Sequence, residues 1–401
     1  MKKQLVSILT AGCLMAAMVP AAFAADTNDL QAQINAAQAG STITLSENTT
    51  ITEPLVIDKA ITLDGASYSL SGTMENGLIC IDTDDLVTIQ DLTVNGSSIG
   101  IDLISDAPEV KIENSTINVP SRGIRFWDNG ENTGVFTGAN LTLDNTTVQN
   151  TLKPTDKTYE NWSHQGDSRG ISIWNVKNST INIVNGSEIL GFGYPINMAG
   201  DMVNGVRDME DSTINITDSD IWGWCALNIW TIDTTFNIKN SHLKGFVETD
   251  NAWNSFATVV LNEDIYKGVT DSSKANVFNI SGGSVSSTCV SNVEEVYHCL
   301  FRLDKEFMSE FNFAQANRKK VALTCTDPFS AFLATYEGME IPDFETWAKT
   351  KLTGAAENTT YYWEAIAPGV NAPKPAGLFI QSADTVTLLD GGMGHEGGFN
   401  Q

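Results

Sequence analysis

A short motif that ends in tryptophan recurs along the chain, and its side chains are of the kinds that bind sugars. It reads Gly-Ile-Arg-Phe-Trp at 123–127, Gly-Ile-Ser-Ile-Trp at 170–174 and Ala-Leu-Asn-Ile-Trp at 226–230. Flat aromatic faces stack on sugar rings, while amide, hydroxyl and guanidinium groups hydrogen-bond to their hydroxyls. The candidate ligand-binding residues are Arg125, Trp127, Ser172, Trp174, Asn197, Asn228 and Trp230.

The segment before the second motif carries groups that could do acid–base chemistry. Residues 153–169 include Trp162, His164, Asp167 and Arg169. A carboxylate could act as a base and a guanidinium could stabilise developing negative charge. If the protein is an enzyme, the candidate catalytic residues are Arg125, Asp167 and Arg169. The alternative is a solvated loop with an ion pair.

Metal chemistry has little support in the sequence. The four histidines, His164, His242, His298 and His395, are far apart, which argues against a zinc site or a catalytic triad. No cofactor is predicted. Calcium could bind exposed acids such as Asp82, Asp84 and Asp85, although their spacing matches no known calcium loop.

A second pattern repeats more often and indicates the fold. It reads apolar, any, apolar, any, Asn or Asp, small polar, any, apolar, and its clearest copies are 110–117, 141–148, 214–221 and 236–243. Looser copies lie at 87–94, 181–189 and 278–285. Alternating apolar residues predict short strands with one buried face. Strands this short need stacking at a fixed period to form a core, which indicates a solenoid.

The repeated Asn or Asp should make the same bend in every coil. Asn and Asp tolerate the left-handed backbone conformation, and stacked amides can bond from one coil to the next. The chain contains 34 Asn residues, more than its 23 Lys and Arg together. The tryptophan motif then forms another strand of the coil. Ile124 and Phe126 should point inward, and Arg125 and Trp127 outward. The alternative is that the tryptophans are covered by long loops and only pack.

The beginning of the chain resembles the right-handed parallel β-helix proteins of the pectin lyase-like superfamily. The residues concerned are an amphipathic helix at 29–37, followed by Gly-Ser-Thr-Ile-Thr-Leu at 40–45 and Ile-Thr-Leu-Asp-Gly at 61–65. The resemblance covers about residues 26–305 and implies an all-β parallel β-helix with a helical N-terminal cap. It also implies that the strand carrying the tryptophan motif lies on the floor of a polysaccharide-binding cleft. It is closest to the pectate-lyase-like adhesive domains of bacterial surface proteins.

The same family includes lyases and hydrolases, but their catalytic patterns are missing. Calcium-dependent pectate lyases place several acids on or beside this strand, whereas the predicted floor shows Asp102, Arg125, Ser172, Asn197 and Asn228. Hydrolases of the family carry Asn-Thr-Asp, Asp-Asp and Gly-His-Gly runs on neighbouring coils. Here Asp84-Asp85 and Gly394-His395 are isolated, so hydrolysis by paired carboxylates gains no support.

The first 24 residues are typical of a secretory signal peptide. Lys2 and Lys3 precede an apolar stretch, and Ala22-Phe23-Ala24 provides a cleavage site. The alternatives are a transmembrane helix, which Pro20 disfavours, and a lipid-modified Cys13. Apart from this segment, no stretch is long and apolar enough to span a bilayer. The protein is therefore expected to be secreted and extracellular.

Charge and cysteine content limit the possible partners. The formal net charge is -26, which argues against nucleic-acid binding and against simple capture of polyanions. Five cysteines follow the signal peptide, so at least one is free or pairs between chains. One disulfide among Cys289, Cys299 and Cys325 is compatible with the sequence, and its pairing stays open, as does the oligomeric state.

The C-terminal region departs from the repeat. The predicted organisation is a signal peptide at 1–24, a β-helix at 25–304, an irregular and partly helical insertion at 305–376, a closing coil at 377–390 and a flexible tail at 391–401. Helices are expected at 329–336 and 343–352, and a small separate domain is the alternative. The predicted function is binding of extracellular carbohydrate in adhesion or glycan capture. The alternatives are a polysaccharide lyase or glycoside hydrolase with an atypical site, and a structural surface protein.

Overall fold

The computed structural model describes most of the repeat region and parts of the C-terminal region. The residues described are 22–24, 30–127, 135–152, 168–199, 202–203, 206–207, 210–247, 256–262, 265, 269–289, 298–303, 308–314, 322–325, 329–334, 346, 350–353, 359–365 and 376–382.

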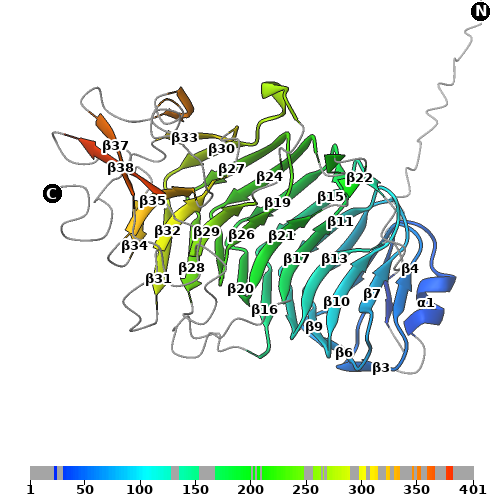
Figure 1. Ribbon diagram of the computed structural model, residues 1–401. Helices are drawn as coiled ribbons and strands as arrows, with labels where there is room; N and C mark the ends of the chain where they lie inside the picture. The colour runs from blue at the N-terminus through cyan, green and yellow to red at the C-terminus, as the bar shows by residue number, and fades with distance from the viewer. Residues whose placement is uncertain are drawn as a thin grey trace, which may run out of the picture.

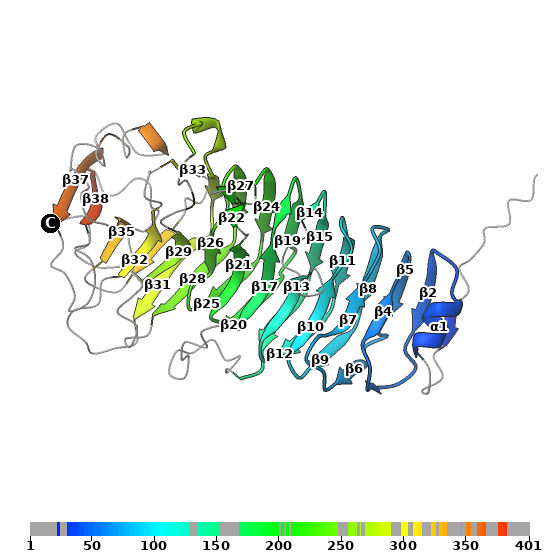
Figure 2. The same ribbon diagram turned by 45° about the vertical axis from the view of Figure 1, so that its right-hand side comes forward.

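Three long sheets wind together into a parallel β-helix, with one strand of each sheet in every regular coil (Figure 1). Within the repeat region, all neighbouring strands of these three sheets pair in parallel, as the stacked-coil prediction requires, so the predicted all-β parallel β-helix is confirmed. The stack runs from a single short helix at the N-terminal end to a small antiparallel arrangement at the other end (Figure 2).

Sheet A contains the apolar-x-apolar part of the repeat. Its strands, in spatial order, are β1 (Ala22–Ala24), β2 (Ser41–Thr44), β5 (Ile61–Asp64), β8 (Val87–Gln90), β11 (Glu109–Glu113), β15 (Asn140–Asp144), β19 (Thr180–Val184), β24 (Ser212–Thr217), β27 (Thr234–Lys239), β30 (Val277–Ser281), β33 (Glu310–Ala314) and β36 (Leu352–Thr353).

Sheet B follows the Asn or Asp corner of each coil. Its strands are β3 (Thr49–Ile51), β6 (Ser69–Gly72), β9 (Thr93–Gly96), β12 (Thr116–Val119), β16 (Thr147–Asn150), β20 (Glu188–Phe192), β25 (Asp220–Gly223), β28 (His242–Val247), β31 (Ser284–Cys289) and β34 (Ala322–Cys325).

Sheet C contains the tryptophan motif. Its strands are β4 (Leu55–Ile57), β7 (Gly77–Ile81), β10 (Ile99–Leu103), β13 (Arg122–Phe126), β17 (Arg169–Trp174), β21 (Tyr194–Ala199), β26 (Leu227–Ile229), β29 (Phe256–Leu261), β32 (His298–Arg302), β35 (Phe329–Ala334), β38 (Ala376–Ser382) and β37 (Thr359–Ala365). The smaller elements are β14 (Phe136–Thr137) paired with β18 (Val176–Lys177), β22 (Met202–Val203) paired with β23 (Val206–Arg207), and a 3-10 turn at Ser272–Lys274.

The core is a column of apolar side chains that the three sheets enclose. Ile112, Leu143 and Ile183 occupy equivalent positions in successive coils and are fully buried. Toward the C-terminal end the column becomes aromatic, and the rings of Phe236 and Phe278 stack with their centroids 4.5 Å apart. Because similar side chains stack on one another in successive coils, each short strand gains buried neighbours that it would not have alone.

The repeated Asn or Asp adopts the left-handed conformation that the sequence predicts. The backbone φ is positive at every clear copy of the corner, and the corners are Asp91 (49°), Asn114 (50°), Asn145 (49°), Asn185 (56°), Asp218 (52°) and Asn240 (50°). After four of these corners comes a buried hydroxyl residue, namely Ser115, Thr146, Ser219 and Ser241. For example, the Ser115 hydroxyl accepts a hydrogen bond from the Leu92 amide one coil earlier (3.2 Å). Each bend therefore also links two coils.

Asparagine also forms a ladder of amides on the outer face of sheet A. Asn215 donates to Asn182 at 2.8 Å, Asn237 donates to Asn215 at 2.9 Å, and the row continues through Asn279 and Asn312 at 2.9 Å and 3.0 Å. The repeat pattern treated this position as variable, so this ladder is not predicted. At the corner itself, where amide bonds were predicted, Asn145 donates to Asn114 at 2.8 Å.

A helix covers the first strand of sheet C. The predicted N-terminal helix is present as α1 (Leu30–Ala36), with Leu30 and Ile34 buried. The Gln31 side chain bonds to both backbone groups of Val56 in β4, donating to its carbonyl at 2.9 Å and accepting from its amide at 2.7 Å. This amide takes the place of a neighbouring strand and so blocks an edge that would otherwise be open to association. Strand β1 lies within the predicted signal peptide.

The C-terminal region corrects two predictions. The helix expected at 329–336 is wrong, because Phe329–Ala334 is strand β35, parallel to β32. Strands β33 and β34 likewise extend sheets A and B past residue 304. The closing coil expected from 377 onward is also wrong over the residues described, since β38 runs antiparallel to β35 and β37. Thr346, Thr350 and Lys351 are helical, as expected within 343–352, and residues 383–401 lie outside the description.

Two further predictions concern cysteines and membrane spans. Cys80 is a free thiol, and the Cys225 thiol donates to the Leu227 carbonyl at 3.2 Å. The side chains of Cys289, Cys299 and Cys325 lie outside the part of the chain that the structure describes. No helix among the described residues is long and apolar enough to cross a membrane.

The left-handed conformation of the corners predicts that glycine is tolerated there better than alanine. Asp218 is exposed and has a φ of 52°. Asp218→Ala should lower the stability by about 1 kcal/mol relative to Asp218→Gly, because a Cβ is penalised in this conformation and glycine carries none. The difference in urea midpoint between these two variants measures the effect. Equal midpoints would contradict the strain that we assign to the corner.

Candidate functional site

Four of the predicted ligand-binding residues form one row across sheet C together with Asp102. Strand pairing places Asp102 beside Arg125, Arg125 beside Ser172, and Ser172 beside Asn197. The row continues from Asn197 to Asn228. We call these five residues the sheet C row. It continues at one end to Cys80 and at the other to Val260 and the backbone of Arg302.

The predicted alternation on these strands is confirmed. Ile124 and Phe126 are buried in the core, with 0% and 1% exposure. Arg125 and Trp127 are directed away from the core. Phe126 packs edge-on against Phe136 of β14, with their ring centroids 5.4 Å apart. The turn segment that contains Phe136 therefore fixes the strand immediately before Trp127.

Most of the sheet C row is nevertheless buried. Arg125 is 6% exposed, Ser172 4% and Asn197 3%. These side chains point out of the coil as predicted, but they are not open to solvent. These three side chains therefore lie under the outermost surface of sheet C and support it.

Asp102 and Arg125 form an ion pair in this buried layer. The Arg125 Nε donates to Asp102 Oδ1 at 2.7 Å, and its Nη2 donates to Oδ2 at 2.8 Å. Asp102 is 1% exposed and also accepts a hydrogen bond from the Gly77 amide at 2.7 Å. A Cβ on Gly77 would lie within 2.9 Å of Asp102 atoms, so glycine is needed for this approach. The bidentate geometry satisfies the carboxylate and cancels the charge of the guanidinium.

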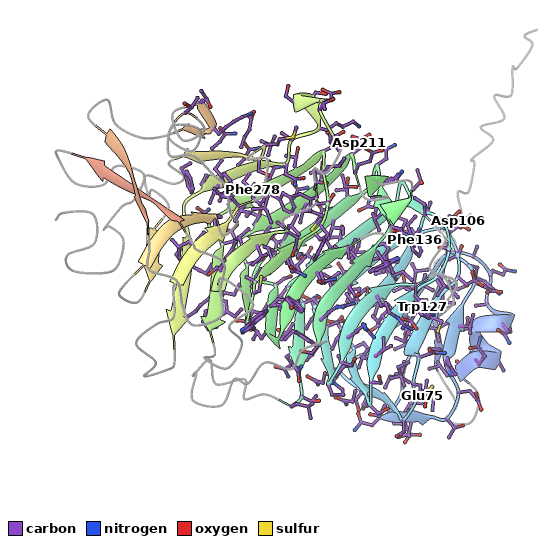
Figure 3. The ribbon with its side chains drawn as sticks, in the orientation of Figure 1. Glu75, Asp106, Trp127, Phe136, Asp211 and Phe278 are labelled. Carbon is purple, nitrogen blue, oxygen red and sulfur yellow. The ribbon has the colours of Figure 1, made fainter. Side chains whose placement is uncertain are left out.

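Trp127 lies on this ion pair. The guanidinium carbon of Arg125 is 3.9 Å from the centroid of the Trp127 ring, within the range of a cation–π contact. One face of the indole is therefore occupied by Arg125. Trp127 is partly exposed, and Figure 3 shows it on the sheet C side near Phe136.

Trp174 and Trp230 continue the column that begins with Trp127. Trp174 follows Ser172 by two residues, as Trp127 follows Arg125, and it pairs with Ala199 in the next coil. Trp230 comes directly after Ile229, the partner of Met198, so it lies beside Ala199. Both are partly exposed, and Trp230 packs against the core. We call Trp127, Trp174 and Trp230 the tryptophan column, in which Ala199 leaves a gap of one coil, each coil adding ~4.8 Å.

Side-chain amides are hydrogen-bonded to one another at the Asn228 end of the sheet C row. Asn228 donates to Asn197 at 2.7 Å, and Asn262 donates to Asn228 at 2.9 Å. Asn228 is partly exposed, whereas Asn197 is buried. Of the three predicted amide and hydroxyl ligands, Asn228 is thus the one at the surface.

Two of the candidate catalytic residues, Arg125 and Arg169, lie apart on sheet C. Arg169 begins β17 and pairs with Arg122, three positions before the Arg125–Ser172 pair. Three residues along a strand separate them by about 10 Å. Asp167 lies outside the described residues. Arg125 is already paired with Asp102, and among the residues that the structure describes no set of catalytic groups surrounds it.

Cys80 extends the sheet C row by one coil, and it is not among the residues predicted from the sequence. Its thiol lies one coil from Asp102. Burial, and to a lesser extent the nearby Asp102 carboxylate, raise its pKa to about 11. At neutral pH it is therefore a protonated thiol and a poor nucleophile. Strict alternation along β7 could have placed it in the row.

Neither metal ligands nor relatives identify the site. Among the residues described, no group of three or more His, Cys, Asp and Glu side chains could hold a metal ion. Comparisons with protein-family models, with curated proteins and with solved structures find no match for this chain.

The buried ion pair predicts strong coupling between its two residues. Asp102→Asn leaves the Arg125 charge uncompensated and should cost about 3–5 kcal/mol. Combining it with Arg125→Gln should recover most of that loss, because no charge then remains buried. Urea midpoints of the single and double variants measure the coupling.

The exposed pair of Lys111 and Glu113 on sheet A provides the control. Lys111→Gln should change the stability by less than about 1 kcal/mol. Additive effects of the Asp102 and Arg125 substitutions would contradict the pairing.

Proposed function

We propose that this protein is a secreted bacterial parallel β-helix protein of the pectin lyase-like superfamily that binds extracellular carbohydrate on sheet C. The observation that carries the proposal is the tryptophan column: three indoles at equivalent positions, all partly exposed, beside the mostly buried sheet C row. Indole faces with amides nearby are well suited to sugar rings. Secretion and superfamily membership rest on the N-terminal sequence and on the resemblance described above.

Rigid support favours binding by these residues. The indoles extend from strands whose inward neighbours are fully buried, such as Ile173 and Ile229. The αL residue Asn175 ends β17 directly after Trp174, and its amide bonds to Ala199 at 3.1 Å. Binding groups held on strands lose little conformational entropy when a ligand binds.

The catalytic alternative gains no comparable support. Its central residue, Arg125, has its charge matched by Asp102 and one indole on its face. A group in this position can orient a neighbour, but two of its nitrogens already donate to the Asp102 carboxylate. We therefore place Arg125 under the binding surface.

The test combines a glycan array with titration of any glycan that binds. Trp127→Ala together with Trp174→Ala should weaken binding by about tenfold or more, because two stacking faces are lost. Trp222→Ala is the matched control, because Trp222 is a partly exposed indole on sheet B, beside Lys244. It should leave the affinity unchanged.

Assays for reducing sugars and for unsaturated products separate the alternatives. Cleavage of a polysaccharide that Arg125→Ala or Asp167→Ala abolishes would replace the binding proposal with an enzymatic one. Absence of both binding and cleavage would leave a structural surface protein.

A further inference from the structure

The mostly buried sheet C row beside the tryptophan column indicates what kind of glycan the column accepts. The sheet C row contains one cation, Arg125, and one anion, Asp102, and the two form a bidentate pair with little exposure. The remaining members, Ser172, Asn197 and Asn228, are uncharged. The row therefore presents no net charge to a ligand that lies on the indoles.

Two other cations on these strands, Arg122 and Arg169, lie away from the indoles. Arg122 and Arg169 pair at the opposite ends of their strands, five residues before Trp127 and Trp174. That separation is about 16 Å along the strand. The chain as a whole has a formal net charge of -26, which repels polyanions at a distance.

The same ion pair sets the position of the first indole. Arg125 is fixed at two nitrogens by Asp102, and Asp102 is itself fixed by the Gly77 amide. The guanidinium covers one face of Trp127 at 3.9 Å. A ligand can therefore stack only on the opposite face of the Trp127 ring. The orientation of that face depends on the position of Arg125.

We infer that the tryptophan column binds an uncharged polysaccharide, and that Asp102 is a positioning residue for it, acting through Arg125 on Trp127. This inference rests on the proposed function and adds to it the class of ligand and the residue that orients the platform. Stacking and neutral hydrogen bonds supply the affinity, so binding should depend little on salt.

The ligand class is tested with matched neutral and anionic polymers. The probes are hydroxyethyl cellulose, dextran, galactan and xylan against carboxymethyl cellulose, dextran sulfate and polygalacturonate. Affinity electrophoresis of the full secreted chain should show retardation by at least one neutral polymer and by none of the anionic ones. Titration of that polymer should give the same dissociation constant, within about twofold, at low salt and at about 0.5 M NaCl.

The positioning role is tested with Asp102→Asn combined with Arg125→Gln. This variant removes both charges together, which avoids a buried unpaired charge. Its affinity for the neutral polymer should fall by about tenfold. The emission of Trp127, obtained by difference from the matching Trp127→Phe protein, should shift in the variant. Lys111→Gln with Glu113→Gln, an exposed pair on sheet A, is the control and should change neither measurement.

The outcomes separate this inference from the proposed function. Binding of anionic polymers alone, or binding that weakens strongly with salt, overturns the inference and leaves carbohydrate binding intact. Unchanged affinity and unchanged Trp127 emission in the folded double variant overturn the positioning role. Failure to bind any polymer overturns both proposals.

Discussion

The structure depends on one constraint: each residue of a coil lies directly over its counterpart in the next coil. Short parallel strands have no stable core alone, so identical positions must accept similar neighbours above and below. Stacked isoleucines fill the interior, and stacked amides such as Asn182 and Asn215 extend along the outside of sheet A. The tryptophan column and the sheet C row beside it arise from the same stacking on sheet C.

Much of this could be predicted from the sequence because stacking leaves a repeated pattern. The αL corners were predictable from the recurring Asn or Asp, and the inward direction of Ile124 followed from alternation. The ion pair between Asp102 and Arg125 was harder to foresee. Both residues were placed on one face, but the pattern gives neither their burial nor their bidentate geometry.

The C-terminal region shows where such reasoning fails. Phe329, Phe332 and Leu333 have helical spacing, yet they lie in β35, where Phe332 pairs with Phe301. In a solenoid the preceding coil offers unpaired backbone groups to which the next strand can bond. This pairing outweighs a weak local preference for helix. The corner residue is also missing from this part of the sequence, so nothing in it marked the repeat.

The central claim is that sheet C is the ligand-binding face and that its indoles make the contact. The most direct measurement is hydroxyl-radical footprinting of the tryptophans with and without a polysaccharide that the protein binds. The account predicts that the ligand protects Trp127, Trp174 and Trp230 from oxidation and leaves Trp222 on sheet B unchanged. Protection of Trp222 with no change in the tryptophan column would contradict it.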